Sequence, residues 1–118
     1  MSEAELKLLT QQAVEDYPNM SQAHEVYMYM LFGSPCGYFL QAVMKNDLME
    51  SFGRADRVNR DLMFDITSWL CRCPFRQALG SPEAYNEWIK IGGAIGMYRS
   101  SNEEQPDDKT EMPGVQSK

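Results

Sequence analysis

The sequence predicts an all-α protein, a compact bundle of four or five short helices in one domain over residues 1–98, followed by a disordered acidic tail over residues 99–118. Apolar residues recur at three- and four-residue spacing in several stretches, which is the periodicity of an amphipathic helix. Capping residues, glycine and proline stand at the boundaries between these stretches. No stretch alternates apolar and polar residues as a strand does. The length of 118 residues allows one hydrophobic core.

Helix signals are clearest at the start of the chain. Ser2 and Glu5 match a capping box, in which each side chain accepts a hydrogen bond from the backbone of the other. Pro18 ends the helix that follows. A second helix is expected to begin at Ser21 and to end at Gly33, because glycine readily adopts the left-handed conformation that closes a helix.

The middle of the chain continues the pattern. An apolar stripe runs over residues 36–52, and Asp47 can cap a new helix within it, so one helix or two are possible. A further helix ends at Pro74, and Ser81 begins the last one. The glycine-rich residues 91–96 are expected to close the domain as a turn. The predicted core consists of Leu40, Val43, Leu48, Phe52, Val58, Leu62, Ile66, Trp69 and Trp88.

The charge and hydropathy of the sequence limit the classes of function that it can have. The net charge of −6 is concentrated at the ends of the chain, since residues 1–25 carry one lysine and five acids, while residues 45–76 carry six basic and five acidic groups. An acidic chain without a basic face argues against nucleic-acid binding. No apolar run approaches the ~20 residues that span a membrane. The first residues are acidic, unlike a secretory signal, so we expect a cytoplasmic protein without membrane contact.

The sequence shows no assembled catalytic or metal-binding set. The three cysteines, an odd number, are expected to be reduced thiols. The pair Cys71 and Cys73 is spaced too tightly for a structural zinc site, and His24 is the only histidine. We therefore expect no metal, no cofactor and no enzymatic activity.

Three groups of residues are candidates for a site or a structural role. Tyr and Met are favoured at protein interfaces, which makes the second helix a candidate partner-binding surface. Arginine side chains and a helix start can bind an anionic ligand. Clustered polar residues between short helices can instead form one buried hydrogen-bond network, which is the favoured interpretation for that region. The partner-binding candidates are Glu25, Tyr27, Met28 and Tyr29, the ligand-binding candidates are Arg54, Arg57 and Ser81, and the network comprises Asn46, Asp47, Arg54, Asp56 and Asn59.

Motifs within residues 36–93 resemble a known group of proteins. They are a Gly-x-Phe-Leu segment at Gly37, an Asn-Asp-Leu turn at Asn46, Arg-Ala-Asp at Arg54, and Gly-Ser-Pro-Glu at Gly80, followed by a tryptophan. Together they resemble a family of small proteins encoded by tailed bacteriophages and prophages. The chain departs from that pattern at two places, where Leu79 replaces a tryptophan and Cys71-Arg72 replaces a Tyr-Asn pair.

The resemblance implies that the protein originates from a phage or prophage, but it does not imply a particular biochemical activity. With the absence of a catalytic set, it leads us to expect a non-enzymatic phage accessory protein in the host cytoplasm. Such a protein would bind a host protein, for example a component of a defence or transcription system, and modulate or inhibit it. Two alternatives remain open: a protein that binds a small ligand such as a nucleotide signal, and a structural virion component that self-assembles into a homo-oligomer.

Overall fold

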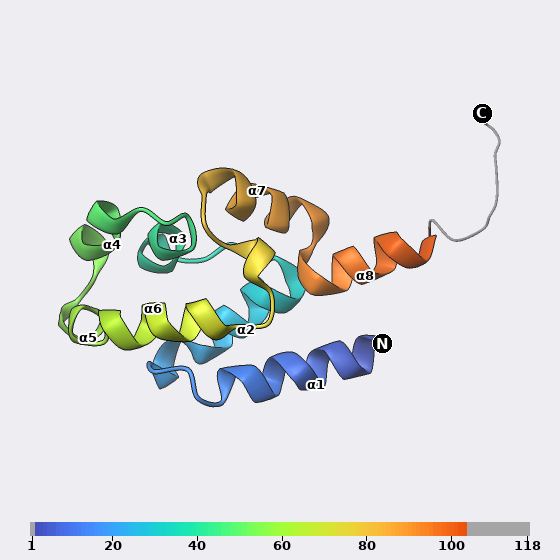
Figure 1. Ribbon diagram of the computed structural model, residues 1–118, viewed down its shortest axis with the longest axis horizontal. Coiled ribbons are helices and arrows are strands. Elements are labelled where there is room, and N and C mark those ends of the chain that lie inside the picture. The colour runs from blue at the N-terminus through green and yellow to red at the C-terminus, as the bar shows by residue number, and fades with distance from the viewer. Residues whose placement is uncertain (1, 104–118) are drawn as a thin grey trace.

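The computed structural model describes residues 2–103, and all regular secondary structure in that range is helical, which confirms the all-α fold class (Figure 1). The α-helices are α1 (Glu3–Val14), α2 (Ala23–Phe32), α3 (Tyr38–Met44), α4 (Leu48–Arg54), α5 (Arg57–Asp61), α6 (Met63–Arg72), α7 (Pro82–Ile91) and α8 (Gly93–Glu103). Two 3₁₀ turns, η1 (Met20–Gln22) and η2 (Arg76–Ala78), precede α2 and α7. None of the helices within residues 2–103 is long and apolar enough to cross a membrane.

Side chains at the helix starts cap four of the eight α-helices described, α1, α4, α5 and α7. The Ser2 hydroxyl accepts the Glu5 N–H at 3.1 Å, and the Glu5 carboxylate accepts the Ser2 N–H at 2.6 Å, so the predicted capping box is present. Asp47, Asp56 and Ser81 cap α4, α5 and α7, each accepting the N–H of the third residue onward. Each cap satisfies a backbone donor that the helix itself leaves without a partner.

The bundle contains more and shorter helices than the four or five predicted. The apolar stripe over residues 36–52 divides into α3 and α4, because Asn46 takes a left-handed conformation with φ of 63° and Asp47 then caps a new helix. The stretch before Pro74 divides at Leu62, whose backbone departs from helical geometry between α5 and α6.

The C-terminal part of the domain differs from the prediction. Gly92 ends α7 with φ of 87°, but Gly93 begins the helix α8 instead of a closing turn. The helix includes Arg99, whose guanidinium pairs with the Glu3 carboxylate of α1 at 2.6 Å. The helical domain therefore extends beyond the predicted boundary at residue 98. The remainder of the predicted tail, residues 104–118, lies outside the described residues.

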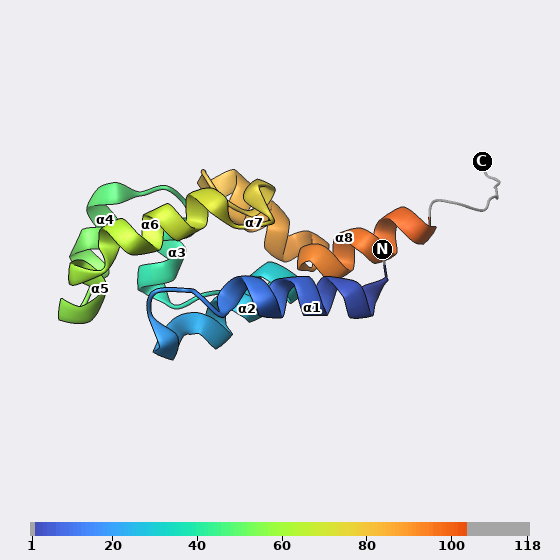
Figure 2. The same ribbon diagram turned by 60° about the horizontal axis from the view of Figure 1, so that its bottom comes forward.

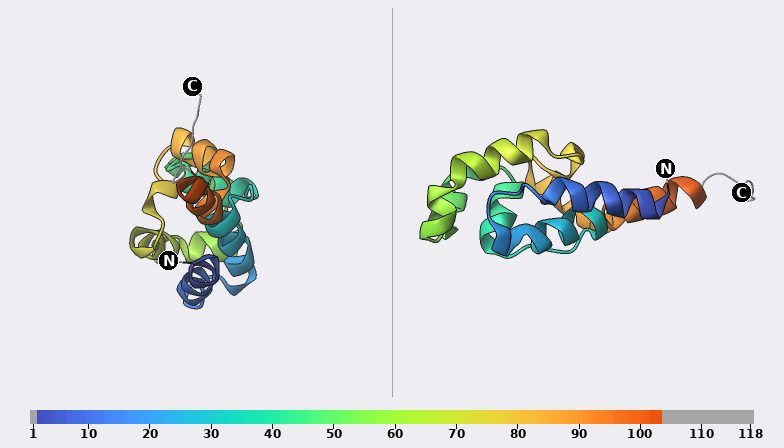
Figure 3. Two further views of the ribbon diagram at one scale, coloured as in Figure 1. Left: turned by 90° about the vertical axis from the view of Figure 1, so that its right-hand side faces the viewer. Right: turned by 90° about the horizontal axis from the view of Figure 1, so that it is seen from below.

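Helix α2 occupies the centre of the fold, packed against α1 on one side and α8 on another (Figures 2 and 3). Its Tyr29 ring stacks on the Tyr85 ring of α7 with centroids 5.2 Å apart. The Tyr29 hydroxyl donates to the Ala78 carbonyl at 2.6 Å, and the Trp88 indole N–H donates to the Tyr29 carbonyl at 2.8 Å. These bonds satisfy the polar atoms that burial of the aromatic rings would otherwise leave unpaired.

The core confirms part of the predicted list and corrects the rest. Leu40, Ile66, Trp69 and Trp88 are buried, and Val43 and Leu62 are half-buried. The prediction is wrong for Leu48, Phe52 and Val58, which are 65%, 45% and 55% exposed. Helical periodicity identifies an apolar face but not what that face contacts, and the apolar face of α4 points to solvent. The buried volume comes instead from residues such as Val26, Met30, Leu31, Met44 and Met63.

The end of α2 and the start of α8 approach so closely that only glycine fits. Gly33 and Gly93 both have positive φ, 70° and 69°. A Cβ atom added to Gly33 would lie 2.8 Å from the Gly93 nitrogen and 2.8 Å from the Trp88 carbonyl oxygen. One added to Gly93 would lie 2.7 Å from the Leu31 carbonyl oxygen. Contacts this short with backbone atoms cannot be relieved by rotating a side chain, so both positions require glycine.

Candidate functional site

The structure separates the four residues predicted to form a partner-binding surface on α2. Tyr29 has no exposed surface, so it cannot belong to such a surface and that part of the prediction is wrong. The Glu25 carboxylate accepts the Gly37 N–H at 2.5 Å, and this bond connects α2 to the start of α3. Met28 is half-buried, and its carbonyl accepts the Ser34 N–H at 3.3 Å where α2 ends.

Tyr27 faces an open groove between α1 and α2, which we call the α1–α2 groove. Its volume is about 350 Å³, and its lining residues are Gln11, Val14, Ala23, His24 and Tyr27. Gln11 and Val14 lie three residues apart on α1, while Ala23 and Tyr27 lie four apart on α2, so each pair shares one helix face.

Two aromatic rings form one wall of this groove. His24 is exposed and its ring stacks on the half-buried Tyr27 ring, with centroids 6.2 Å apart and planes 21° from parallel. The imidazole and the phenol bring hydrogen-bonding atoms beside the apolar side chains of Val14 and Ala23. The α1–α2 groove can therefore accept an apolar side chain of another protein and hydrogen-bond the groups around it.

The three candidate ligand-binding residues lie on three different helices, and two of them already have partners. Arg54, in α4, pairs with the Glu50 carboxylate at 2.7 Å and its guanidinium lies 5.0 Å from the centre of the Tyr38 ring. The Ser81 hydroxyl accepts the Ala84 N–H as the cap of α7. Arg57 is exposed at the first residue of α5. The structure gives Arg54 and Ser81 local roles and does not gather the three around one ligand.

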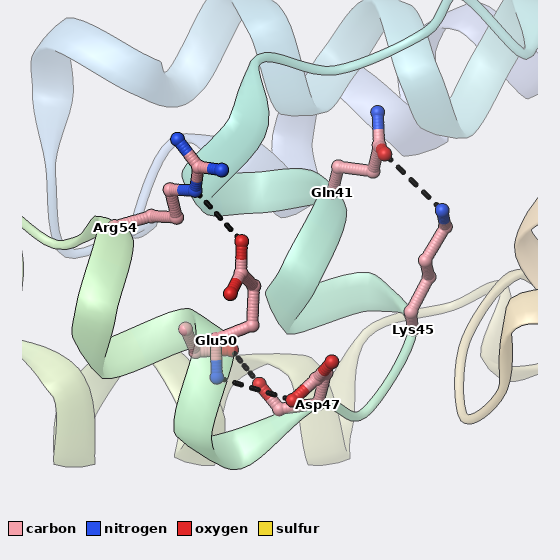
Figure 4. A network of polar contacts seen from close by, with 6 residues as sticks. Gln41, Lys45, Asp47, Glu50 and Arg54 are labelled. Carbon is pink, nitrogen blue, oxygen red and sulfur yellow. Dashed lines mark hydrogen bonds and ion pairs between the residues drawn. The ribbon is translucent and has the colours of Figure 1, made fainter.

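The residues predicted to form one buried polar network instead make separate, local contacts. Figure 4 shows Asp47, Glu50 and Arg54 on the surface of α4, with the Asp47 carboxylate accepting the Glu50 N–H at 3.1 Å. Asn46 is exposed at the bend before α4, and the Asp56 carboxylate accepts the backbone N–H of Asn59 at 2.8 Å. Because short helices bring their own capping residues to the surface, most of these groups are exposed, and the prediction of one buried network is wrong.

A smaller buried network does exist around Asn59. Its side-chain oxygen accepts the Asn19 amide at 2.9 Å and the Gln22 amide at 2.8 Å. The Gln22 oxygen in turn accepts the Tyr17 hydroxyl at 2.9 Å. These bonds join α5 to the segment between α1 and α2. Sequence analysis missed this network because its members are 37 and 40 residues apart and no local pattern relates them.

Two of the three cysteine thiols, those of Cys36 and Cys73, are buried. Burial raises the pKa of Cys36 to about 12 and also raises the pKa of Cys73, which keeps both thiols protonated at neutral pH. Cys71 is exposed. Within residues 2–103 no three histidine, cysteine or acidic side chains are grouped so that they could hold a metal ion.

Sequence analysis also missed an exposed apolar surface, which we call the α4 patch. It consists of Leu48, Met49 and Phe52 on one face of α4 and Phe64 in the first turn of α6. The apolar periodicity of residues 36–52 identifies an apolar face that includes Leu48 and Phe52, but it does not show whether that face is buried or exposed.

Comparisons with known proteins do not extend this description, since no protein-family model, curated protein sequence or solved structure matches the chain. The likeness to phage-encoded proteins therefore stays a prediction.

Proposed function

We propose that this protein is a non-enzymatic accessory protein that acts by binding another protein in the α1–α2 groove. The observation that carries the proposal is the accessible Tyr27 ring, stacked on His24 in an open groove of about 350 Å³. Tyrosine is enriched where proteins recognise one another, because it offers a large rigid ring with a hydrogen-bonding tip.

The composition of the α1–α2 groove favours a partner that binds transiently. Gln11, His24 and the Tyr27 hydroxyl are polar, while Val14 and Ala23 are apolar. Surfaces of non-obligate complexes have such a mixed composition, because both partners must also be stable in water when they are apart.

The resemblance to phage-encoded proteins suggests the class of partner. We propose a host protein, such as a component of a defence or transcription system, whose activity is modulated or inhibited by the bound accessory protein. A nucleotide-binding role through Arg54 and Arg57 has less support, because Arg54 is already paired with Glu50.

Site-specific photocrosslinking tests the proposal. A benzophenone amino acid at Gln11, which lines the groove, is expected to crosslink a specific protein in cells of the encoding host. The same group at Gln12 is the matched control, since Gln12 is the neighbouring exposed glutamine but lines a different pocket with Asp16 and Trp69.

A pair of tyrosine variants provides the second arm. Tyr27→Ser removes the ring from the groove and is expected to abolish the crosslink from position 11. Tyr38→Ser is its control, because Tyr38 is 73% exposed at the start of α3 and lies outside the groove. A crosslink from position 11 that survives Tyr27→Ser, or equal crosslinking from positions 11 and 12, would contradict the proposal.

A further inference from the structure

A cavity of about 250 Å³ opens between α6, the end of α3 and the segment that joins α6 to α7, and we call it the α3–α6 cavity. Thr67, Leu70 and Cys71 lie three and four residues apart on α6, so they share the helix face that borders it. Gly80 borders it from the joining segment, and its N–H donates to the Met44 carbonyl at 2.9 Å. This bond ties the start of α7 to the end of α3, so the walls of the cavity are fixed to one another.

The lining of the α3–α6 cavity is apolar where it is buried and polar where it is exposed. Leu70 is 6% exposed, and Val43 and Leu79 are half-buried. An apolar interior with a few polar groups at its edge is typical of small-molecule sites, where the apolar part gives affinity and the polar part gives orientation. The exposed lining side chains are those of Asn46, Thr67, Cys71 and Arg76.

The charge at the edge of this cavity is positive. Among the lining residues, all of which lie within residues 2–103, Arg76 is the one arginine, lysine or acid. Its Nη1 donates to the Cys71 carbonyl at 3.1 Å, which positions the guanidinium beside the cavity. No carboxylate of residues 2–103 pairs with it. A guanidinium has five N–H donors in a planar fork that fits a carboxylate, so donors remain for a ligand.

An adjoining cavity of about 60 Å³ does not reverse this charge. It shares Val43, Asn46 and Thr67 with the α3–α6 cavity, and Asp47 lines it. The Asp47 carboxylate accepts the Glu50 N–H at 3.1 Å as the cap of α4, so it is directed to that helix. The Asn46 side chain, where the two cavities meet, adds amide N–H groups that can donate to an anion.

We propose that the α3–α6 cavity binds a small organic acid, whose carboxylate pairs with Arg76 and whose apolar body packs against Val43, Leu70 and Leu79. One guanidinium neutralises a carboxylate, whereas a phosphate ester carries about two negative charges at neutral pH. Pockets that enclose drug-sized molecules measure about 300–1,000 Å³, so a cavity of about 250 Å³ suits a smaller molecule. None of the three ligand-binding candidates from the sequence lines this cavity.

Alkylation of Cys71 tests the proposal. Cys71 is exposed and lines the cavity, whereas Cys36 and Cys73 are 8% and 6% exposed, so N-ethylmaleimide should modify Cys71 first. Hexanoate is the probe, and its binding should slow this reaction, followed by mass spectrometry, because the bound molecule covers the thiol. A ligand this small binds with a dissociation constant of about 10 mM. About 20 mM hexanoate should therefore reduce the rate roughly threefold.

Two further probes separate the charge from the apolar body. Hexanamide has the same carbon chain without the charge, and acetate has the charge without the chain. Each is expected to change the alkylation rate by less than about 1.5-fold at about 20 mM, since it makes only part of the contacts. Titration of the ¹⁵N-labelled protein with hexanoate should shift the backbone amide signals of Thr67 and Gly80 along one saturation curve, which measures binding without the thiol.

Arginine variants locate the charge that binds the probe. Arg76→Gln is expected to abolish the protection by hexanoate, and Arg76→Lys, which keeps the charge but not the fork, should retain part of it. Arg72→Gln is the matched control, because Arg72 is exposed at the end of α6 and lines a different pocket with Asp16 and Trp69. The same change in net charge there should leave the protection intact. Far-UV circular dichroism confirms that each variant is folded.

Several results would overturn the inference. They are a lack of protection or of amide shifts with hexanoate, equal protection by hexanamide or by acetate, and protection that survives Arg76→Gln or that Arg72→Gln removes equally. The α3–α6 cavity shares no lining residue with the α1–α2 groove. These results therefore leave the proposed protein-binding function unaffected, and photocrosslinking at Gln11 tests that function separately.

Discussion

Replacing Gly93 by alanine tests the close approach between the end of α2 and the start of α8. The added methyl group would lie 2.7 Å from the Leu31 carbonyl oxygen and would press on the backbone of Gly33. Neither atom belongs to a movable side chain, so α8 would have to shift away from α2. The residue would also keep a φ of 69°, a conformation that disfavours any residue with a Cβ.

The expected loss of stability follows from these two effects. A non-glycine residue in the left-handed region costs about 1–2 kcal/mol. Inserting a methyl group into a tightly packed contact costs about 1–3 kcal/mol more. We therefore expect Gly93→Ala to lower the free energy of unfolding by about 2–5 kcal/mol, which corresponds to a fall in Tm of at least about 10 °C for a domain of this size.

Urea unfolding followed by far-UV circular dichroism measures this change, and two other glycines serve as controls. Gly80 has a φ of 112° but open space around it, so Gly80→Ala isolates the conformational cost without the clash. Gly53 lies in α4 with nothing near its Cβ position and no positive φ, so Gly53→Ala should stabilise the protein by about 0.4–1 kcal/mol. If Gly93→Ala destabilises the protein no more than Gly80→Ala does, the close contact between α2 and α8 is refuted.

Two further predictions concern buried groups. Asn59→Ala leaves the Asn19 and Gln22 amides without their acceptor, and we expect a loss of about 2–3 kcal/mol in urea unfolding. The exposed Asn86→Ala should change stability by less than about 0.5 kcal/mol, and a similar effect at both positions would contradict the assigned network. The Cys36 thiol ionises near pH 9 when exposed and near pH 12 in the fold, so the folded state holds the proton that the unfolded state loses, and stability should fall as pH rises from about 9 toward 12. Burial also raises the pKa of Cys73, Tyr17, Tyr29 and Tyr85, so these groups add to the fall. Cys36→Ala should therefore make the fall less steep, and an unchanged slope of stability against pH would show that Cys36 does not contribute to it.

The sequence was most informative where structure depends on neighbouring residues. Ser2, Asp47 and Ser81 act as helix caps because each satisfies backbone N–H groups within the next three residues, and such contacts are visible in a short pattern. Gly33 ends α2 for an equally local reason.

The failures arose where structure depends on distant contacts. The glycines of residues 91–96 suggested a turn, but Gly93 begins α8 because this helix passes against the end of α2, some 60 residues earlier in the chain. Leu48 and Phe52 were assigned to the core because an apolar face gives no information on its partner. Tyr29 and Tyr27, two residues apart, have opposite environments that depend on the positions of α7 and α1.

The position of the described chain ends has a practical consequence for experiments on this protein. The N-terminus and the end of α8 emerge together, far from α4 and α5 (Figure 3). An affinity tag or fluorescent protein attached at the N-terminus should therefore leave the α4 patch free.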